Sequence, residues 1–177
     1  MTRFSGLLAT AALFAGAAPA LGASISATPV AEGRVLILRP LSFVRVTDLD
    51  FGTVVSSNVA GAVTINANSG ARSTTPGVTP MPIAPGSRGY FAGSGSAGQE
   101  VIINLTPATV LTNTITADTI PVVAMALNNN ITDTTATRTI NATTLTFEVG
   151  VGGTILVAAN QADGDYVSNF NITADYQ

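Results

Sequence analysis

GDYVSNFNITADYQ, residues 164–177, is the stretch that decides the fold of this chain. From Tyr166 the even positions carry tyrosine, serine, phenylalanine, isoleucine, alanine and tyrosine, and the odd positions from Asn169 are all polar. Alternation with period two predicts a β-strand that has one buried and one solvated face. Because an exposed edge strand promotes aggregation, we expect another segment or another molecule to cover this one.

The first residues have the pattern of a secretory signal. Arg3 supplies the positive charge, residues 7–17 are apolar, and Ala18-Pro19-Ala20 is a small-x-small cleavage site, with cleavage after Ala23 as the alternative. The apolar run is too short for a membrane span. We therefore expect residues 1–20 to be removed and the mature chain to be exported without inserting into the membrane.

Composition restricts the chemistry. The chain of 177 residues fits one domain, and its net charge of −3 argues against nucleic acid as a partner. Cysteine and histidine are absent from the sequence, so disulfides, thiolate nucleophiles, histidine triads and ordinary transition-metal sites are excluded. We expect a protein that is not an enzyme and has no cofactor.

A short arm follows the signal. Apolar side chains at alternate positions predict a strand before Pro29, and these are Leu21, Ala23, Ile25 and Ala27. The arm, residues 21–32, is interpreted as a segment that pairs with another strand or as a frayed terminus. Residues 33–177 are then one β-sandwich domain.

Residues 34–46 carry apolar side chains at both odd and even positions. A strand that is apolar on both faces is typical of a strand covered on both faces, so we expect this segment deep in the sandwich. Pro40 splits it into two strands or kinks it at a sheet edge.

The remaining chain reads as short strands separated by turns. Strands are predicted at residues 53–55, 62–67, 100–105, 120–127, 143–149 and 154–158, with a bulge or bend at the glycines of 150–153. Residues 68–99 are rich in Gly, Ser, Thr and Pro and predict a long surface loop around a short strand at Tyr90 and Phe91. The fold class is all-β, an antiparallel β-sandwich.

Two acidic pairs are candidate cation sites. Asp48 and Asp50 flank Leu49, and Asp163 and Asp165 flank Gly164. Two carboxylates without further ligands are weak calcium sites, whereas short acids in turns commonly hydrogen bond their own backbone. We predict turns here and no metal site.

The C-terminal stretch resembles that of pilus subunits assembled by the chaperone-usher pathway. It shares a glycine fourteen residues from the end, Gly164, alternating apolar residues and a penultimate aromatic residue, Tyr176. The resemblance implies an immunoglobulin-like sandwich that lacks its last strand. It also implies a groove that a periplasmic chaperone fills first and the N-terminal arm of another subunit fills in the fibre, after passage through an outer-membrane usher.

Carried onto this chain, the resemblance implies two sets of residues. The subunit and chaperone groove would consist of Gly164, Tyr166, Phe170, Ile172, Ala174 and Tyr176. The donor arm would carry Leu21, Ala23, Ile25 and Ala27.

A second resemblance covers most of the mature chain. Residues 49–52, Leu-Asp-Phe-Gly, and residues 152–154, Gly-Gly-Thr, together with the ending Tyr176-Gln177, resemble a family of small exported bacterial proteins known only as a domain of unknown function.

Two functions follow as expectations. The first is a structural subunit of a bacterial fimbria, exported through the periplasm to the cell surface, that polymerises head-to-tail with copies of itself or sister subunits. The alternative is a secreted monomeric sandwich that binds a carbohydrate or a host surface through residues 68–99, with its arm folded back on itself.

Overall fold

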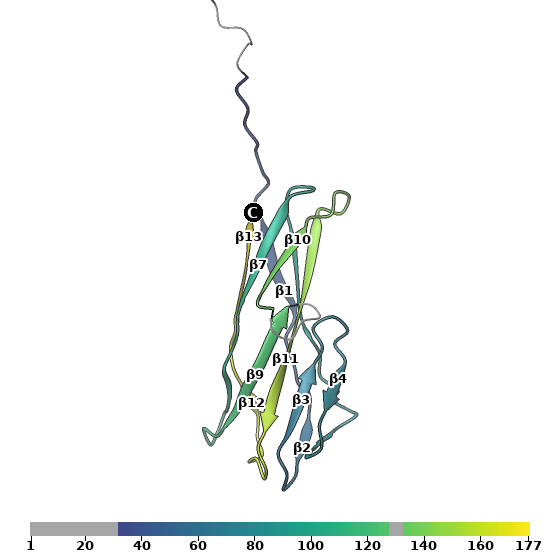
Figure 1. Ribbon diagram of the computed structural model, residues 1–177, viewed down its shortest axis with the longest axis vertical. Coiled ribbons are helices and arrows are strands. Elements are labelled where there is room, and N and C mark those ends of the chain that lie inside the picture. Colours follow the sequence, from purple (N-terminus) through teal and green to yellow (C-terminus); the bar gives the residue numbers. More distant parts are fainter. Residues whose placement is uncertain (1–31, 128–132) are drawn as a thin grey trace, which may run out of the picture. The chain divides into compact units, whose positions relative to one another are not determined.

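The computed structural model describes residues 32–127 and 133–177 (Figure 1). The chain divides into two compact units, one ending at Leu36 and the other spanning Ile37–Gln177. In the first unit, residues 32–36 are described; they form no regular secondary structure and are exposed. The predicted signal, residues 1–20, and the predicted plugs Leu21, Ala23, Ile25 and Ala27 lie outside the described residues.

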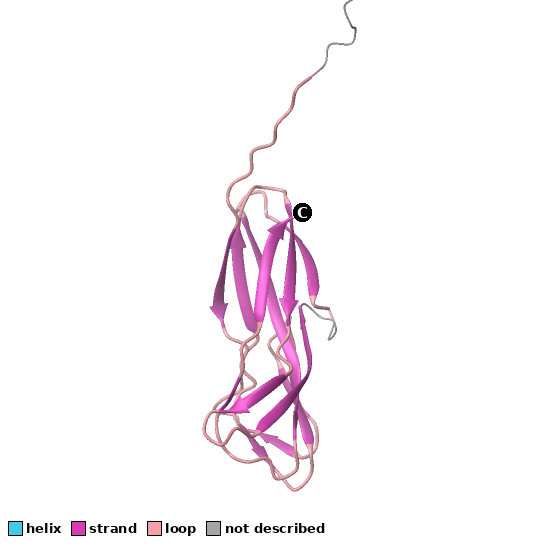
Figure 2. Cartoon of the chain, turned by 90° about the vertical axis from the view of Figure 1, so that its left-hand side faces the viewer, coloured by secondary structure: helices cyan, strands magenta, loops and turns pink. Residues whose placement is uncertain are grey.

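The second unit is all-β, as the alternation predicts, and its sheets are antiparallel and arranged as a sandwich. Within the described residues there is no helix (Figure 2). The strands are β1 Ser42–Thr47, β2 Val54–Ser56, β3 Gly61–Ile65, β4 Arg72–Thr74, β5 Val78–Pro80, β6 Gly89–Ser94, β7 Glu100–Thr106, β8 Val110–Asn113, β9 Thr119–Leu127, β10 Thr135–Thr139, β11 Thr146–Val157, β12 Tyr166–Val167 and β13 Asn171–Tyr176.

The larger sheet is built around β11. Its order is β1-β6-β11-β9-β8-β12, and β3 and β4 attach to it because β11 pairs with β6 along its first half and with β3 along its second half. A smaller sheet has the order β10-β7-β13, and β2 pairs with β5 in a third. Each strand of the smaller sheet therefore lies at an edge except β7.

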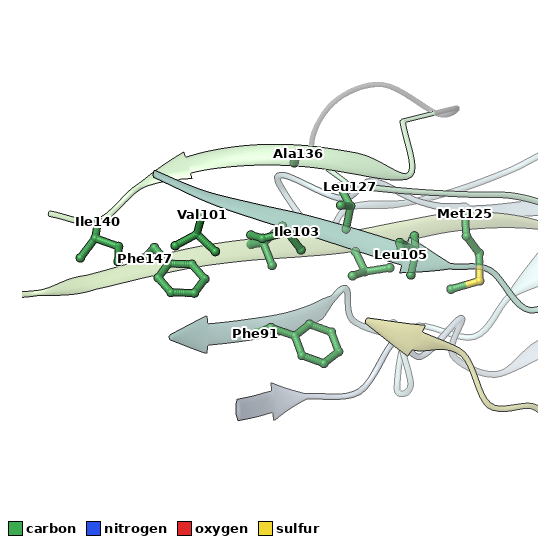
Figure 3. Close-up of a cluster of buried hydrophobic side chains, with 11 residues drawn as sticks. Phe91, Val101, Ile103, Leu105, Met125, Leu127, Ala136, Ile140 and Phe147 are labelled. Carbon is green, nitrogen blue, oxygen red and sulfur yellow. The ribbon is translucent and has the colours of Figure 1, made fainter. Parts of the chain in front are cut away.

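Two clusters of buried apolar side chains hold the sheets together. The first includes Val101 and Ile103 of β7 and Phe147 of β11, whose side chains meet in the core (Figure 3). The second is centred on Val63 of β3 and Ile155 of β11. Alternate residues of β7 and of β11 supply most of the first cluster, as the period of two requires.

The prediction that residues 34–46 lie deep in the sandwich is wrong. Val35, Leu36 and Ile37 are 85%, 71% and 85% exposed, and the strand begins only after Pro40, as the edge strand β1. Phe43 is half-buried, whereas Val44 is exposed. An apolar run therefore reaches solvent in the isolated chain instead of filling its own core.

The prediction for residues 68–99 holds in part: the strand at Tyr90 and Phe91 is confirmed, but the rest of the segment is not one long loop. This segment contains β4, β5 and the six-residue strand β6, which pairs with both β1 and β11. Gly93 of β6 is required there because a Cβ atom would overlap the ring of Phe147. Small residues that make room for an aromatic ring look like loop composition in the sequence.

The glycines of residues 150–153 lie within one continuous strand, β11, and do not bend it into two strands. A Cβ at Gly150 or Gly152 would overlap the backbone of residues 65–67. These glycines therefore allow the backbone of residues 65–67 to lie close against β11.

The predicted strand at the C-terminal stretch is two strands. β12 pairs with β8 in the larger sheet, and β13 pairs with β7 in the smaller one. Within β13 the predicted alternation is confirmed, since Ile172, Ala174 and Tyr176 are half-buried and the residues between them are exposed.

Candidate functional site

The strand β13 has one free edge. Among the described residues it pairs only with β7, in the register Ile172 to Leu105 and Tyr176 to Val101. The N–H of Gln177 donates to the carbonyl of Glu100 at 3.0 Å. Hydrogen-bonded pairs alternate along an antiparallel ladder, so the odd residues of β13 bond to β7 and the N–H and C=O groups of the even residues face the free edge.

The same even residues send their side chains toward the core. Phe170, Ile172, Ala174 and Tyr176 all pack against the first cluster while staying partly exposed. The ring of Phe170 meets that of Phe91 edge-on, with 6.2 Å between their centres. β13 thus offers unpaired backbone groups and incompletely buried apolar side chains along one line.

The strand β1 is the corresponding edge of the larger sheet. It pairs only with β6 among the described residues. Phe43 stacks on both Phe91 and Phe147, each at 5.7 Å between ring centres. Because Phe91 contacts both Phe43 of β1 and Phe170, the residue directly before β13, the core-facing side chains at these two edges meet at the same aromatic group.

Tyr176 ties the end of β13 to the chain that leads into β1. Its hydroxyl accepts the N–H of Ser96 at 2.7 Å and donates to the carbonyl of Arg39 at 2.8 Å. The N–H of Arg39 donates to Oγ of Ser96 at 2.7 Å. Both backbone groups of Arg39 are therefore engaged, and Tyr176 closes this end of the sandwich.

At the other end of β13 lies a pocket of ≈ 930 Å³. Its walls are residues 49–56 and 161–170, and apolar side chains of the second cluster, including Ile120 and Ile155, line its floor. Leu49 and Phe170 line the pocket and also pack against the first cluster. We call the pocket, together with the half-buried faces of β1 and β13, the open groove.

Arg72 fixes one wall of the pocket. Its guanidinium group donates to the carbonyls of Ala84 at 2.8 Å, Met81 at 2.9 Å and Thr53 at 3.2 Å. Sequence reasoning missed this role because a single arginine in a Gly- and Pro-rich segment carries no pattern. Its side chain adds to the backbone hydrogen bonds that already join the two segments, such as those between Thr53 and the residues Met81 and Ala84.

Gly164 belongs to the other wall and contributes backbone shape instead of a groove-filling side chain. It has φ +136°, and a Cβ there would press on the amide of Asn113. Asn113 is 4% exposed; its Nδ2 donates to the carbonyl of Asp163 at 3.1 Å, and its Oδ1 accepts the N–H of Ile115 at 2.9 Å. The turn at Gly164 is thus fixed to the end of β8.

Tyr166 is half-buried against the second cluster and lines the pocket. Its hydroxyl donates to the carbonyl of Ala162 at 2.8 Å and accepts Nε2 of Gln161 at 2.9 Å. Of the six predicted groove residues, Gly164, Tyr166 and Phe170 line the pocket, and the remaining three lie on β13. Their assignment to subunit contact stays a prediction.

The acidic pairs of the sequence lie in connections between strands, where Asp50 also forms an isolated β-bridge with Ser87. Asp48 forms an ion pair with Arg45 at 2.6 Å, and the carboxylate of Asp50 accepts the N–H of Gly52 at 2.8 Å. In the described parts of the chain, no three acidic side chains gather in a way that would hold a metal ion. No helix long and apolar enough to cross a membrane occurs in those parts either.

Comparison with known proteins assigns this chain to one protein family. No curated protein and no solved structure matches this chain. A family model matches residues 41–176, a span that includes β1, both pocket walls and β13. The chain belongs to the family described as Domain of unknown function (DUF4402).

Proposed function

We propose that this protein is a structural subunit of a bacterial surface fimbria that polymerises head-to-tail by donor-strand exchange. In this proposal the open groove accepts a β-strand from another copy, or from a sister subunit. The free edge of β13, together with the half-buried apolar side chains beside it, is the observation that carries the proposal.

Strand addition uses the features found along β13. Backbone groups of an incoming strand would pair with those of Ile172, Ala174 and Tyr176, and its side chains would complete the burial of Phe43, Phe170 and Ile172. Backbone pairing supplies affinity, and the spacing of side chains fixes the register. An edge strand this apolar is also an aggregation risk until it is covered, which supports a periplasmic chaperone as an earlier occupant.

The same arrangement favours a filament over a closed dimer. A groove and an arm are different surfaces, so their contact is heterologous, and repeated heterologous contacts build chains. The secretory pattern of residues 1–20 supports export through the periplasm, with the mature chain at the cell surface in the fimbria.

The alternative, a monomeric binding module, depended on a long loop at residues 68–99. Since β4, β5 and β6 divide this segment, the connections between its strands are much shorter than the single loop that the sequence predicts for binding a carbohydrate. We therefore propose the fimbrial function alone.

A peptide test addresses this proposal. The domain beginning at Arg39 is mixed with a peptide of residues 21–38, and thermal unfolding and stoichiometry are measured. We expect a one-to-one complex with a higher Tm, because a ligand that binds only the folded state stabilises it by about 2.7 kcal/mol at a concentration a hundred times its Kd.

The matched control is the same domain with Ala174→Pro. This substitution removes an N–H that faces the free edge and leaves the β7 ladder intact. The control domain should fold, should not bind the peptide, and should keep the same Tm when the peptide is added. A stable unmodified domain whose Tm the peptide does not change would rule out strand donation by this arm.

A further inference from the structure

An exposed apolar run precedes the sandwich. Residues 35–38 are Val-Leu-Ile-Leu, and the first three of them are 85%, 71% and 85% exposed. Residues 32–41 form no strand in the structure. Contiguous exposed apolar side chains of this kind mark an interaction surface.

The pocket at the β12 end of the open groove is the apolar surface that this run fits. Its floor is formed by side chains of the second cluster, and its volume of ≈ 930 Å³ gives room for several aliphatic side chains. Three acids, Asp50, Asp163 and Asp165, stand around it, and the described residues that line it include no arginine. The run itself is bracketed by Arg34 and Arg39.

We infer that residues 35–38 of a second copy occupy this pocket, so that the donor segment extends from the predicted plugs through to residue 38. Aliphatic side chains would fill the apolar floor, and Arg34 and Arg39 would face the acidic rim. This inference rests on the proposed function and specifies which residues of the partner copy enter which part of the groove.

The position of Arg39 gives the direction. Its hydrogen bonds to Tyr176 and Ser96 show that the chain enters its own sandwich at the Tyr176 end of β13. In a filament whose copies share one orientation, the arm of one copy reaches the next copy at the opposite end of β13, which is the pocket end. The residues nearest the sandwich, 35–38, then meet the pocket, and residues nearer the N-terminus continue along β13.

The lengths agree with this register. From Val35 back to Ala27 is eight residues, about 26 Å when extended, and from Phe170 to Tyr176 is six residues, about 20 Å. With Val35 in the pocket beside Phe170, the six residues back to Pro29 therefore already span β13, and Ala27 and Ile25 extend beyond Tyr176. The donor runs antiparallel to β13 in this arrangement.

Self-insertion is disfavoured by the same contacts. To enter its own groove beside β1, the run would have to reverse at residues 39–41. That turn would break the bonds that Arg39 forms through its N–H and its carbonyl.

Disulfide cross-linking tests the register, because the chain contains no cysteine of its own. The mature full-length chain receives Ile37→Cys together with Val167→Cys, which lines the pocket on β12 and is 57% exposed. The control pairs Ile37→Cys with Val123→Cys, which is 52% exposed on β9 and lies outside the pocket lining. Polymer formation without oxidation is followed by light scattering, and covalent ladders by non-reducing gels.

We expect polymers in both chains and a covalent ladder in the Val167 pair alone. Polymers without that ladder would overturn the inference and leave the fimbrial function standing. Absence of polymers would overturn both. As a second measurement, Ile37→Asp in the peptide of residues 21–38 should raise its Kd for the domain about tenfold or more, and an unchanged Kd would contradict the inference.

Discussion

At the scale of single residues, Gly164 holds a conformation that other residues avoid. Its φ of +136° and the nearby amide of Asn113 both exclude a side chain. We predict that Gly164→Ala lowers the free energy of unfolding by about 2–3 kcal/mol, measured by urea denaturation, because backbone strain and steric overlap add.

Gly98→Ala is the matched control for that substitution. Gly98 also has positive φ, +69°, but nothing lies within 4 Å of an added Cβ. It should therefore cost about 1 kcal/mol, from backbone strain alone. Equal losses for the two variants would show that the contact with Asn113 does not constrain the turn.

Tyr90 provides a pH-dependent prediction. A hydrogen bond to Glu148 raises the pKa of the Tyr90 phenol above its ordinary 10.0, with smaller contributions from burial and from the Glu148 charge. The folded protein keeps this proton at a pH where the unfolded chain releases it. The stabilisation is therefore complete below pH 10.0 and is lost as the pH rises through the folded pKa.

In urea unfolding above pH 10.0, Tyr90→Phe should lose stability with pH less steeply than the wild type. Glu148→Gln removes the charged acceptor and should flatten the profile in the same direction. Parallel profiles for wild type and Tyr90→Phe would contradict this assignment.

At the scale of elements, the backbone groups of β13 alternate between two environments. Those of odd residues bond to β7, and those of even residues face the free edge. Thr173 bonds to β7, whereas the N–H of Ala174 faces the free edge. Thr173→Pro should therefore destabilise the fold by about 1–3 kcal/mol more than Ala174→Pro, because it leaves a ladder acceptor on β7 without its donor.

Thermal and urea unfolding of the two variants measure this difference in stability. Peptide binding is measured separately, because the variant that is more stable is expected to be the one that does not bind. Ala174→Pro should keep the fold and abolish binding of the peptide of residues 21–38. If Thr173→Pro proved the milder change, the register assigned to the free edge would be wrong.

The sequence predicts some of these elements well and others poorly, for physical reasons. β7 and β13 have alternating faces, so period two finds them. The sequence predicts β6 only as a short strand at Tyr90 and Phe91, because Gly89 and Gly93 make room for neighbouring side chains, which only the packed structure shows. The pocket wall held by Arg72 was missed for the same reason, since its hydrogen bonds go to loop carbonyls distant in sequence.

The run at residues 35–38 illustrates a different limit. Its apolar composition predicts burial, whereas the structure leaves it exposed, and no pattern in one chain says whether its own core or another molecule would cover it. A strand buried in its own core and a strand buried in a neighbour have the same apolar faces. Only the exposure of Val35 and Ile37 in the folded chain distinguishes them.

At the scale of the whole molecule, the proposed assembly makes the arm and the groove two halves of one contact, and each can be disabled separately. Val35→Asp with Ile37→Asp places charges in the arm and leaves the groove intact, whereas Ala174→Pro blocks the groove and leaves the arm intact. Each variant alone should stay monomeric. Mixed in equal amounts, they should form a dimer and nothing longer, since the single complementary contact uses the only intact arm and the only intact groove.

Light scattering of the two variants, separately and mixed, measures this outcome beside the wild type. Head-to-tail assembly requires that the wild type grow beyond the dimer at concentrations where the mixture stops there. A reciprocal exchange of arms between two copies would instead hold the wild type at a closed dimer, because both grooves would be filled at once. A wild type that stops at two copies would therefore replace the filament with a swapped pair, although each groove would still receive an arm.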